Sequence, residues 1–254
     1  MSFCDDLKLT LLVEYKKNIR NGAYGLIQKE FAYNSNRIEG SRLTKKHTSD
    51  LFETRSIYSD GEFKAKDIEE MTGHFVMFNL ALTSLDECLS ENLIKNFHKA
   101  LKQGVFEDIA NGYAIGDYKK RKNFVGDIET ALPNEVPIKM NDLLSWYSCS
   151  NKTLEVLAEF HIRYERIHPF QDGNGRTGRI ILFRECLYND IPPFIIRDCN
   201  KSRYINALRS QDITALVDYF KYEQAWLFDK LDGSLIESYE QWASYFRKIY
   251  KGVD

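Results

Sequence analysis

Apolar residues recur at three- and four-residue steps over most of this chain, which is the spacing of helices that bury one face. The clearest segment runs from Lys66 to Glu87, where the spacing continues from Ile68 to Leu85. The same pattern predicts further helices over residues Asp5 to Arg20, Tyr24 to Glu39, Glu91 to Lys102, Met140 to Tyr147, Leu154 to Ile167, Asn174 to Tyr188, Tyr204 to Arg209, Ile213 to Asp229 and Leu235 to Tyr250. We therefore expect a mainly α fold.

Glycine and proline mark the places where the helical pattern stops. Four glycines stand at expected helix ends, namely Gly22, Gly40, Gly104 and Gly233. Between Gly112 and Pro137 the helical spacing is lost, and short apolar stretches alternate with glycine, aspartate and proline. This segment predicts a small β-hairpin or an extended flap.

Composition indicates a globular protein and argues against a nucleic-acid-binding one. The chain has 254 residues, 43% of them hydrophobic and 28% charged, and we expect a single globular domain over residues 1–254. A formal net charge of −2 provides no cationic field for binding nucleic acid. The basic run from Lys119 to Lys122 is therefore interpreted as a solvated turn or strand edge.

Cysteine usage and hydropathy bear on the compartment. The five cysteines are widely spaced and form no Cys-x-x-Cys pair, which is typical of reduced thiols rather than a disulfide framework or a zinc site. The first residues lack the pattern of a signal peptide, and no apolar stretch is long enough to span a bilayer. We expect a soluble, cytoplasmic protein that has no membrane partner.

The residues that carry chemistry lie in a polar, glycine-rich loop between two predicted helices, from His168 to Arg179. Gly173 and Gly175 let the backbone approach a ligand, and the amides that open the second helix favour an anion. Arg176 and Arg179 are three residues apart and share a helix face, and guanidinium groups suit phosphate oxygens. The loop therefore predicts a polyphosphate site.

Two further side chains of this loop suit catalysis. Asp172 offers an oxygen ligand for Mg²⁺, which proteins usually hold with one or two carboxylates and substrate phosphates. His168, with an ordinary pKa of about 6.5, can act as a general base. Each of these features is more often structural when it occurs alone, but together they favour phosphoryl or nucleotidyl transfer.

The loop resembles the Fic family motif H-x-F-x-[D/E]-G-N-G-R-x-x-R at every specified position, which are His168, Phe170, Asp172, Gly173, Asn174, Gly175, Arg176 and Arg179. The resemblance implies that His168 takes the proton from a target hydroxyl, that Phe170 is a buried anchor and that Asp172 holds Mg²⁺. Gly173, Asn174 and Gly175 would cradle the α- and β-phosphates of ATP. Arg176 would contact the β-phosphate, and Arg179 the γ-phosphate.

The resemblance also bears on the group that is transferred. The related Doc branch, a kinase, lacks the second glycine and the last arginine of the motif, whereas Gly175 and Arg179 are both present here. AMP transfer is therefore favoured over phosphate transfer, although phosphocholine and UMP donors also occur in the family.

A segment further upstream resembles the family's inhibitory signature, [S/T]-x-x-x-E-[G/N], with Ser35, Glu39 and Gly40 at its fixed positions. Ser35 and Glu39 are four residues apart and would share a helix face, and Gly40 suits a helix end. The resemblance implies that Glu39 reaches Arg179 and blocks the site of the γ-phosphate. The alternative is an ordinary helix end with an exposed glutamate.

The resemblance implies a Fic-type helical bundle with a small β-hairpin flap next to the active site. It assigns the N-terminal helices with the inhibitory motif to about residues 24–40, the catalytic core to about 66–220 and C-terminal helices to 221–254. The edge of the flap would hold an extended target segment by main-chain pairing. Lys119 stands where family members commonly have arginine and is assigned no role.

Three residues outside the loop are candidates for nucleotide or metal binding. Tyr204 is the candidate for packing against adenine, with a core tyrosine as an equal alternative, and Gln211 is a weaker candidate for reading the base. His161 lies seven residues before His168 on nearly the same helix face. No third ligand has suitable spacing, so we expect a buried, hydrogen-bonded histidine rather than a metal pair.

The sequence thus predicts a protein adenylyltransferase that uses ATP and Mg²⁺ to place AMP on a serine, threonine or tyrosine hydroxyl of a target protein and is inhibited by Glu39. A second hypothesis is removal of AMP from a modified target, with Glu39 positioning water, or both activities in one chain. A third is a non-catalytic nucleotide-binding regulator, which would have no need of His168. Assembly into a homo-oligomer is left open.

Overall fold

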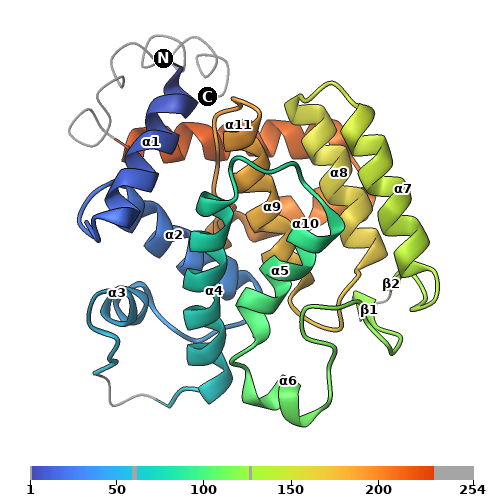
Figure 1. Cartoon of the computed structure of the whole chain (residues 1–254), viewed down its shortest axis with the longest axis horizontal. Helices are drawn as coiled ribbons and strands as arrows, with labels where there is room; N and C mark the ends of the chain where they lie inside the picture. Colours follow the sequence, from blue (N-terminus) through green and yellow to red (C-terminus); the bar gives the residue numbers. More distant parts are fainter. Residues whose placement is uncertain (1, 59–61, 126–127, 232–254) are drawn as a thin grey trace.

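The computed structural model describes residues 2–58, 62–125 and 128–231 of the chain. Within this part it has 11 α-helices, one 3₁₀ helix and two short strands (Figure 1). In chain order these are α1 (Phe3–Lys16), α2 (Ala23–Ile38), α3 (Lys45–Thr54), α4 (Ala65–Thr83), α5 (Glu91–Lys102), α6 (Phe106–Ala110), β1 (Phe124–Val125), β2 (Ile128–Glu129), α7 (Val136–Cys149), α8 (Leu154–Ile167), α9 (Asn174–Tyr188), η1 (Asp198–Asn200), α10 (Lys201–Ser210) and α11 (Ile213–Lys230). The predicted mainly α fold is confirmed.

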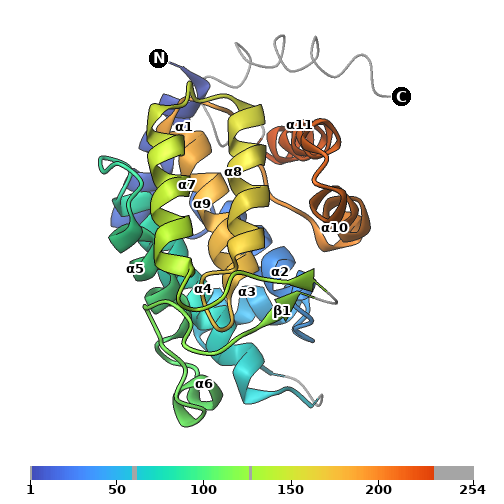
Figure 2. The same cartoon turned by 90° about the vertical axis from the view of Figure 1, so that its right-hand side faces the viewer.

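Helix α9 forms the centre of the bundle (Figure 1) and contacts α1, α2, α4, α5 and α8. Figure 2 shows α8 between α7 on one side and α10 and α11 on the other. Nearly all of α9 is buried, including the apolar run Ile180 to Phe183. Because a helix surrounded by protein must satisfy its charged side chains internally, the arginines at its start need partners from the neighbouring helices.

Two glycines allow close helix crossings. A Cβ atom at Gly73 of α4 would overlap the carbonyl oxygen of Leu101 in α5. A Cβ atom at Gly178 of α9 would lie 2.8 Å from Glu165 Oε1 and 3.0 Å from His161 Cε1 of α8. The second crossing brings the C-terminal end of α8 against the first turn of α9, where the motif residues lie.

Helix α2 packs on the same central helix through an aromatic contact. The ring centroid of Phe31 lies 5.4 Å from that of Phe183 and 6.2 Å from that of Phe78 in α4. The helix ends with Glu39 as its C-cap, and Gly40 follows with φ of 93°, in the left-handed region that glycine adopts without strain. The predicted helix stop at Gly40 is confirmed.

Two helices were not predicted from the sequence. Helix α3 is held by a capping box between Thr44 and His47 rather than by a long apolar stripe, and only Thr48 and Phe52 of its residues are buried. Helix α6 is a single short segment of five residues. Neither is long and apolar enough to produce a clear periodic signal.

Other helix boundaries differ from the predictions at identifiable residues. Helix α7 begins at Val136 rather than Met140, because Pro137 is tolerated in the first turn, where its missing N–H is not needed. Helix α1 ends before Asn18, which has a φ of 55°. Gly22 caps the start of α2 instead of ending a helix.

The remaining differences concern element ends and coverage. Helix α4 ends at Thr83 rather than Glu87, and α10 begins at Lys201 rather than Tyr204. Gly104 follows the C-cap of α5. The helix predicted from Leu235 to Tyr250, with its stop at Gly233, lies outside the described residues.

The segment for which a hairpin was predicted contains a short antiparallel pair. Phe124 pairs with Glu129 and Val125 with Ile128 in the strands β1 and β2. Residues 126–127, which join these strands, lie outside the described part, so a complete flap stays a prediction. None of the described helices is long and apolar enough to cross a bilayer.

The close crossing of α4 and α5 gives a test of the packing. We expect Gly73→Ala to lower the free energy of unfolding by about 1–3 kcal/mol, because the added methyl group forces the helices apart. Gly104→Ala is the matched control, since nothing lies within 4 Å of the position of its Cβ atom. Urea unfolding measures both, and equal midpoints for the two variants would contradict the described crossing.

Candidate active site

The glycine-rich loop between α8 and α9 is fixed by its own side chains. His168 ends α8 with φ of 51°, and Gly173 begins α9 with φ of 80°. The Asn174 side chain accepts a hydrogen bond from the Phe170 amide and donates one to the Phe170 carbonyl, each 2.8 Å long. Asn174 therefore closes the loop, and its side-chain amide is already paired.

Phe170 is fully buried and stacks on the imidazole of His98 in α5, with ring centroids 3.9 Å apart. The same imidazole accepts a hydrogen bond from the Gly116 amide at Nδ1, and its Nε2 atom lies within hydrogen-bond distance of the Asp172 carbonyl oxygen, both at 3.0 Å. Phe170 is thus buried, as expected for an anchor of the loop, and His98 is its stacking partner.

His168 lines a cavity of about 260 Å³ at the end of α8. Its Nδ1 atom lies 3.8 Å from Glu165 Oε2, and the carbonyl of Glu165 also faces the ring. Burial, followed by the positive charge of Lys119, lowers the pKa of His168 to about 4. At neutral pH the imidazole is therefore uncharged, which is the form that a general base requires.

The cavity also brings together residues that are distant in the sequence. Glu39 at the C-terminal end of α2, Gly175 and Arg179 of α9 and Tyr204 of α10 line it with His168. Four of the predicted nucleotide-binding and inhibitory residues therefore surround the predicted base.

Arg179 is buried and is held by the end of α2. Its Nε donates to Ser35 Oγ at 2.9 Å, and one terminal nitrogen donates to the Ser35 carbonyl at 3.0 Å and to Glu39 Oε1 at 2.6 Å. A Cβ atom at position 175 would overlap Glu39 Oε1, so glycine at this position makes room for the carboxylate. The predicted contact between Glu39 and Arg179 is present.

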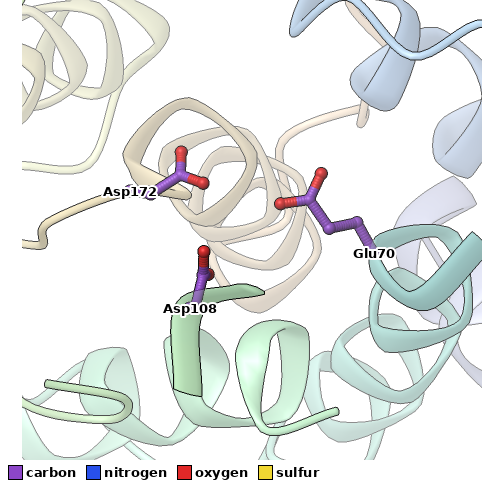
Figure 3. A group of neighbouring side chains, drawn as sticks. All are labelled: Glu70, Asp108 and Asp172. Carbon is purple, nitrogen blue, oxygen red and sulfur yellow. The ribbon is translucent and has the colours of Figure 1, made fainter. Parts of the chain in front are cut away.

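Arg176 points away from this cavity and into a buried ionic cluster. Its guanidinium group lies 2.5 Å from Glu70 of α4 and 3.6 Å from Asp172. Lys102 of α5 lies 2.5 Å from Glu70, 2.5 Å from Asp108 of α6 and 2.8 Å from Asp172. Figure 3 shows the three carboxylates directed at one space from three separate segments.

Asp172 remains the candidate for Mg²⁺ binding. Its side chain is 35% exposed, whereas those of Asp108 and Lys102 are 1% exposed. Burial acts to raise its pKa, but Arg176 and Lys102 outweigh this and hold the pKa well below the usual range. A permanently ionised, partly exposed carboxylate fits an ion that is shared with substrate phosphates.

Two sequence interpretations change. Lys119 is not solvated: it is buried, and its ammonium group donates to Asn123 Oδ1 at 2.5 Å and Thr130 Oγ1 at 2.7 Å, while burial lowers its pKa to about 8. Gln211 lines a separate surface groove rather than the cavity that contains His168.

The histidine and tyrosine outside the loop form a buried pair. His161 Nε2 and the Tyr204 hydroxyl are 2.7 Å apart, so the expected buried, hydrogen-bonded histidine is confirmed. Tyr204 is buried in the core and also lines the cavity, and its contact with adenine stays a prediction.

Several residues of the site were missed in the sequence. Glu70, Lys102 and Asp108 carry no motif signal, because they meet only through the packing of α4, α5 and α6. Glu165 is a second case: burial raises its pKa to about 7, with Arg179 opposing and Glu39 adding to the effect. Its position three residues before His168 was the only sequence signal.

Comparison with known proteins gives a consistent result. Residues 88–185 match the model of the Fic/DOC family, and this range includes the whole loop but not Ser35, Glu39 or Tyr204. Protein adenylyltransferase Fic of Aedes aegypti is 26% identical over 183 residues, which are 70% of this chain and 36% of that protein. A probable protein adenylyltransferase of Aquifex aeolicus is 32% identical over 140 residues, 54% of this chain and 41% of that protein. The chain spans less than half the length of these two relatives.

Solved structures share the fold. A Fic domain containing signalling protein from Bacteroides thetaiotaomicron has a TM-score of 0.70 at 25% identity, covering 91% of this chain and 94% of that chain. The corresponding TM-score for Fic-1 from C. elegans is 0.62 at 19% identity, over 85% and 63% of the two chains. The helical bundle and its loop therefore define a Fic-type fold. Residues 88–185 are similar to the Fic/DOC family, and the chain is related to protein adenylyltransferases of that family.

Removing the charge on Lys119 tests the cause of the lowered pKa of His168. We expect His168 to stay uncharged until the pH falls to about 4, and Lys119→Met to raise the pKa of His168, because one of the two effects that lower this pKa is removed. NMR titration of the imidazole measures this, with exposed Lys120→Met as the control.

The lowered pKa of His168 also makes the stability of the folded protein depend on pH. The pKa of His168 lies below the unfolded value of about 6.5, so the unfolded chain is protonated first and stability falls as the pH falls from about 6.5 toward 4. A His168 pKa near 6.5 in the folded wild type would contradict the described environment.

Proposed function

We propose that this protein transfers AMP from ATP to a hydroxyl side chain of a target protein, and that Glu39 restrains this activity. The observation that carries the proposal is the shared cavity, in which an uncharged histidine and an arginine held by a glutamate face the same space. The relationship to protein adenylyltransferases supports the choice of AMP as the transferred group.

The chemistry follows from the roles of the loop residues. His168 would take the proton from the target hydroxyl as its oxygen attacks the α-phosphorus of ATP, the bond to the β-phosphate breaks, and diphosphate leaves. The Gly175 amide, in the first turn of α9, would face the phosphates together with the positive end of the helix dipole. The Gly173 amide is not free for this, because it already donates to Asp172 Oδ1. Mg²⁺, held by Asp172, would neutralise charge on the phosphates when bound.

Arg176 and Arg179 would differ in how they meet the nucleotide. Arg176 is buried and already paired with Glu70, so it would act on the β-phosphate through its charge from behind the loop and would keep its partner. Arg179 would exchange Glu39 for the γ-phosphate, because a carboxylate and a phosphate compete for the same guanidinium donors. This exchange is the proposed inhibition.

The hairpin segment would hold the target. Thr130, directly after β2, lines the cavity with His168, and Asn123, directly before β1, donates to the Phe170 carbonyl at 2.8 Å. Main-chain pairing of an extended target segment with this hairpin would bring its hydroxyl toward His168.

A second candidate function is the removal of AMP from a modified protein. It is favoured by one observation: the Glu39 side chain is 34% exposed and lines the cavity that contains His168, where it could position a water molecule. The two functions use the same residues and are compatible in one chain.

The two activities are separated by labelled ATP. With α-labelled ATP and a cell extract as the source of targets, we expect Glu39→Gly to incorporate label on the order of 10²-fold faster than wild type, because the phosphates then align for attack. His168→Ala in the Glu39→Gly background should abolish incorporation.

Incorporation from γ-labelled ATP instead would indicate a kinase and contradict the proposal. Glu39-dependent release of AMP from the labelled product would support the second function. Absence of α-label from every protein in the Glu39→Gly reaction, in extracts that support other family members, would leave nucleotide sensing as the better account.

A further inference from the structure

The ionic cluster beneath the loop is arranged around the ammonium group of Lys102. Three carboxylates, from Glu70, Asp108 and Asp172, lie 2.5, 2.5 and 2.8 Å from its Nζ atom. The ammonium group donates hydrogen bonds to Glu70 Oε1 and Asp172 Oδ2. Asp108 pairs with it by charge, because neither oxygen of this buried carboxylate has a hydrogen-bond partner among the described residues. Figure 3 shows these carboxylates meeting from α4, from α6 and from the loop before α9.

The same three carboxylates have the spacing of a metal site. Their ligand oxygens all lie within 4.8 Å of one another, which suits a divalent cation with oxygen ligands at about 2.3–2.6 Å. The position that such an ion would take is the position of Lys102 Nζ. Lys66 and Arg176 contribute two more positive charges at the rim of the cluster, so it is neutral as it stands.

We infer that Lys102 acts as a built-in cation in place of a metal ion between Glu70, Asp108 and Asp172, and so positions Asp172 and Arg176 for the nucleotide. The link to Arg176 runs through Glu70, whose two carboxylate oxygens contact Lys102 and Arg176 separately. The role in nucleotide binding rests on the proposed function, whereas the exclusion of metal does not.

The arrangement has a consequence for metal use. Lys102 and the Gly173 amide occupy one oxygen each of the Asp172 carboxylate, at 2.8 and 2.7 Å. Both oxygens of the partly exposed Asp172 side chain are thus held in place, and an ion that arrives with ATP cannot enter the buried cluster, whose centre Lys102 occupies. Lys102 is a positioning residue that confines the metal to the exposed face of Asp172.

Metal binding without nucleotide tests this directly. In a Mn²⁺ titration followed by calorimetry, we expect no tight site in wild type, and a site at least about tenfold tighter in Lys102→Met, because the vacated position then receives the ion. The new site should be lost in Lys102→Met with Asp108→Asn. Lys99→Met, an exposed lysine on the same helix, is the matched control.

If Lys102→Met fails to fold, metal-induced folding tests the inference instead. If Lys102→Met is unfolded, we expect Mn²⁺ or Ca²⁺ to restore the folded state, since the ion replaces the missing charge. The inference is overturned if neither ion restores it, if folded Lys102→Met binds Mn²⁺ no better than wild type, or if wild type itself binds Mn²⁺ through Asp108.

The positioning role is measured separately in the Glu39→Gly background. We expect Lys102→Met to raise the Mg²⁺ concentration for half-maximal AMP transfer by about tenfold, as changes next to a metal ligand typically do. If the Mg²⁺ concentration for half-maximal transfer is unchanged and only the maximal rate falls, Lys102 does not position Asp172 for the metal. Because the Mn²⁺ titration needs no catalysis, it would still give its expected result in a chain that transfers no AMP.

Discussion

Arg179 is a buried cation that needs an anionic or polar partner at all times, and this need joins the end of helix α2 to the start of helix α9. In the described structure Ser35 and Glu39 meet it with three hydrogen bonds from the end of one helix. A nucleotide that is to bind Arg179 must offer oxygens in place of the Glu39 carboxylate. In the proposed mechanism, phosphate binding and displacement of the Glu39 carboxylate are therefore the same event.

The two arginines of the motif are restrained in different ways. Arg176 has a permanent partner in Glu70, which is itself tied to Lys102 inside the bundle, so this half of the site is formed before any ligand arrives. Arg179 has an exchangeable partner at a helix end, where Glu39 is partly exposed. The rigid half suits positioning of a nucleotide, and the exchangeable half suits control.

Sequence patterns predicted the parts of the fold that depend on local signals. Helices α5, α8 and α9 begin and end at the predicted residues, because each has a strong apolar pattern or a capping residue at its boundary. Helix α3 depends on a capping box rather than on apolar spacing, and it was missed. The buried lysines Lys102 and Lys119 were also missed, since a charged residue is expected at the surface unless its partners, here from distant segments, are known.

The competition at Arg179 is tested most directly by ATP affinity in a double-mutant cycle of Glu39→Gly and Arg179→Ala, with AMP as the ligand that lacks the β- and γ-phosphates. If Glu39 occupies the place of the γ-phosphate, Glu39→Gly tightens ATP binding only when Arg179 is present and leaves AMP binding unchanged. Equal tightening of ATP in the presence and absence of Arg179, or the same gain for AMP, would contradict this exchange.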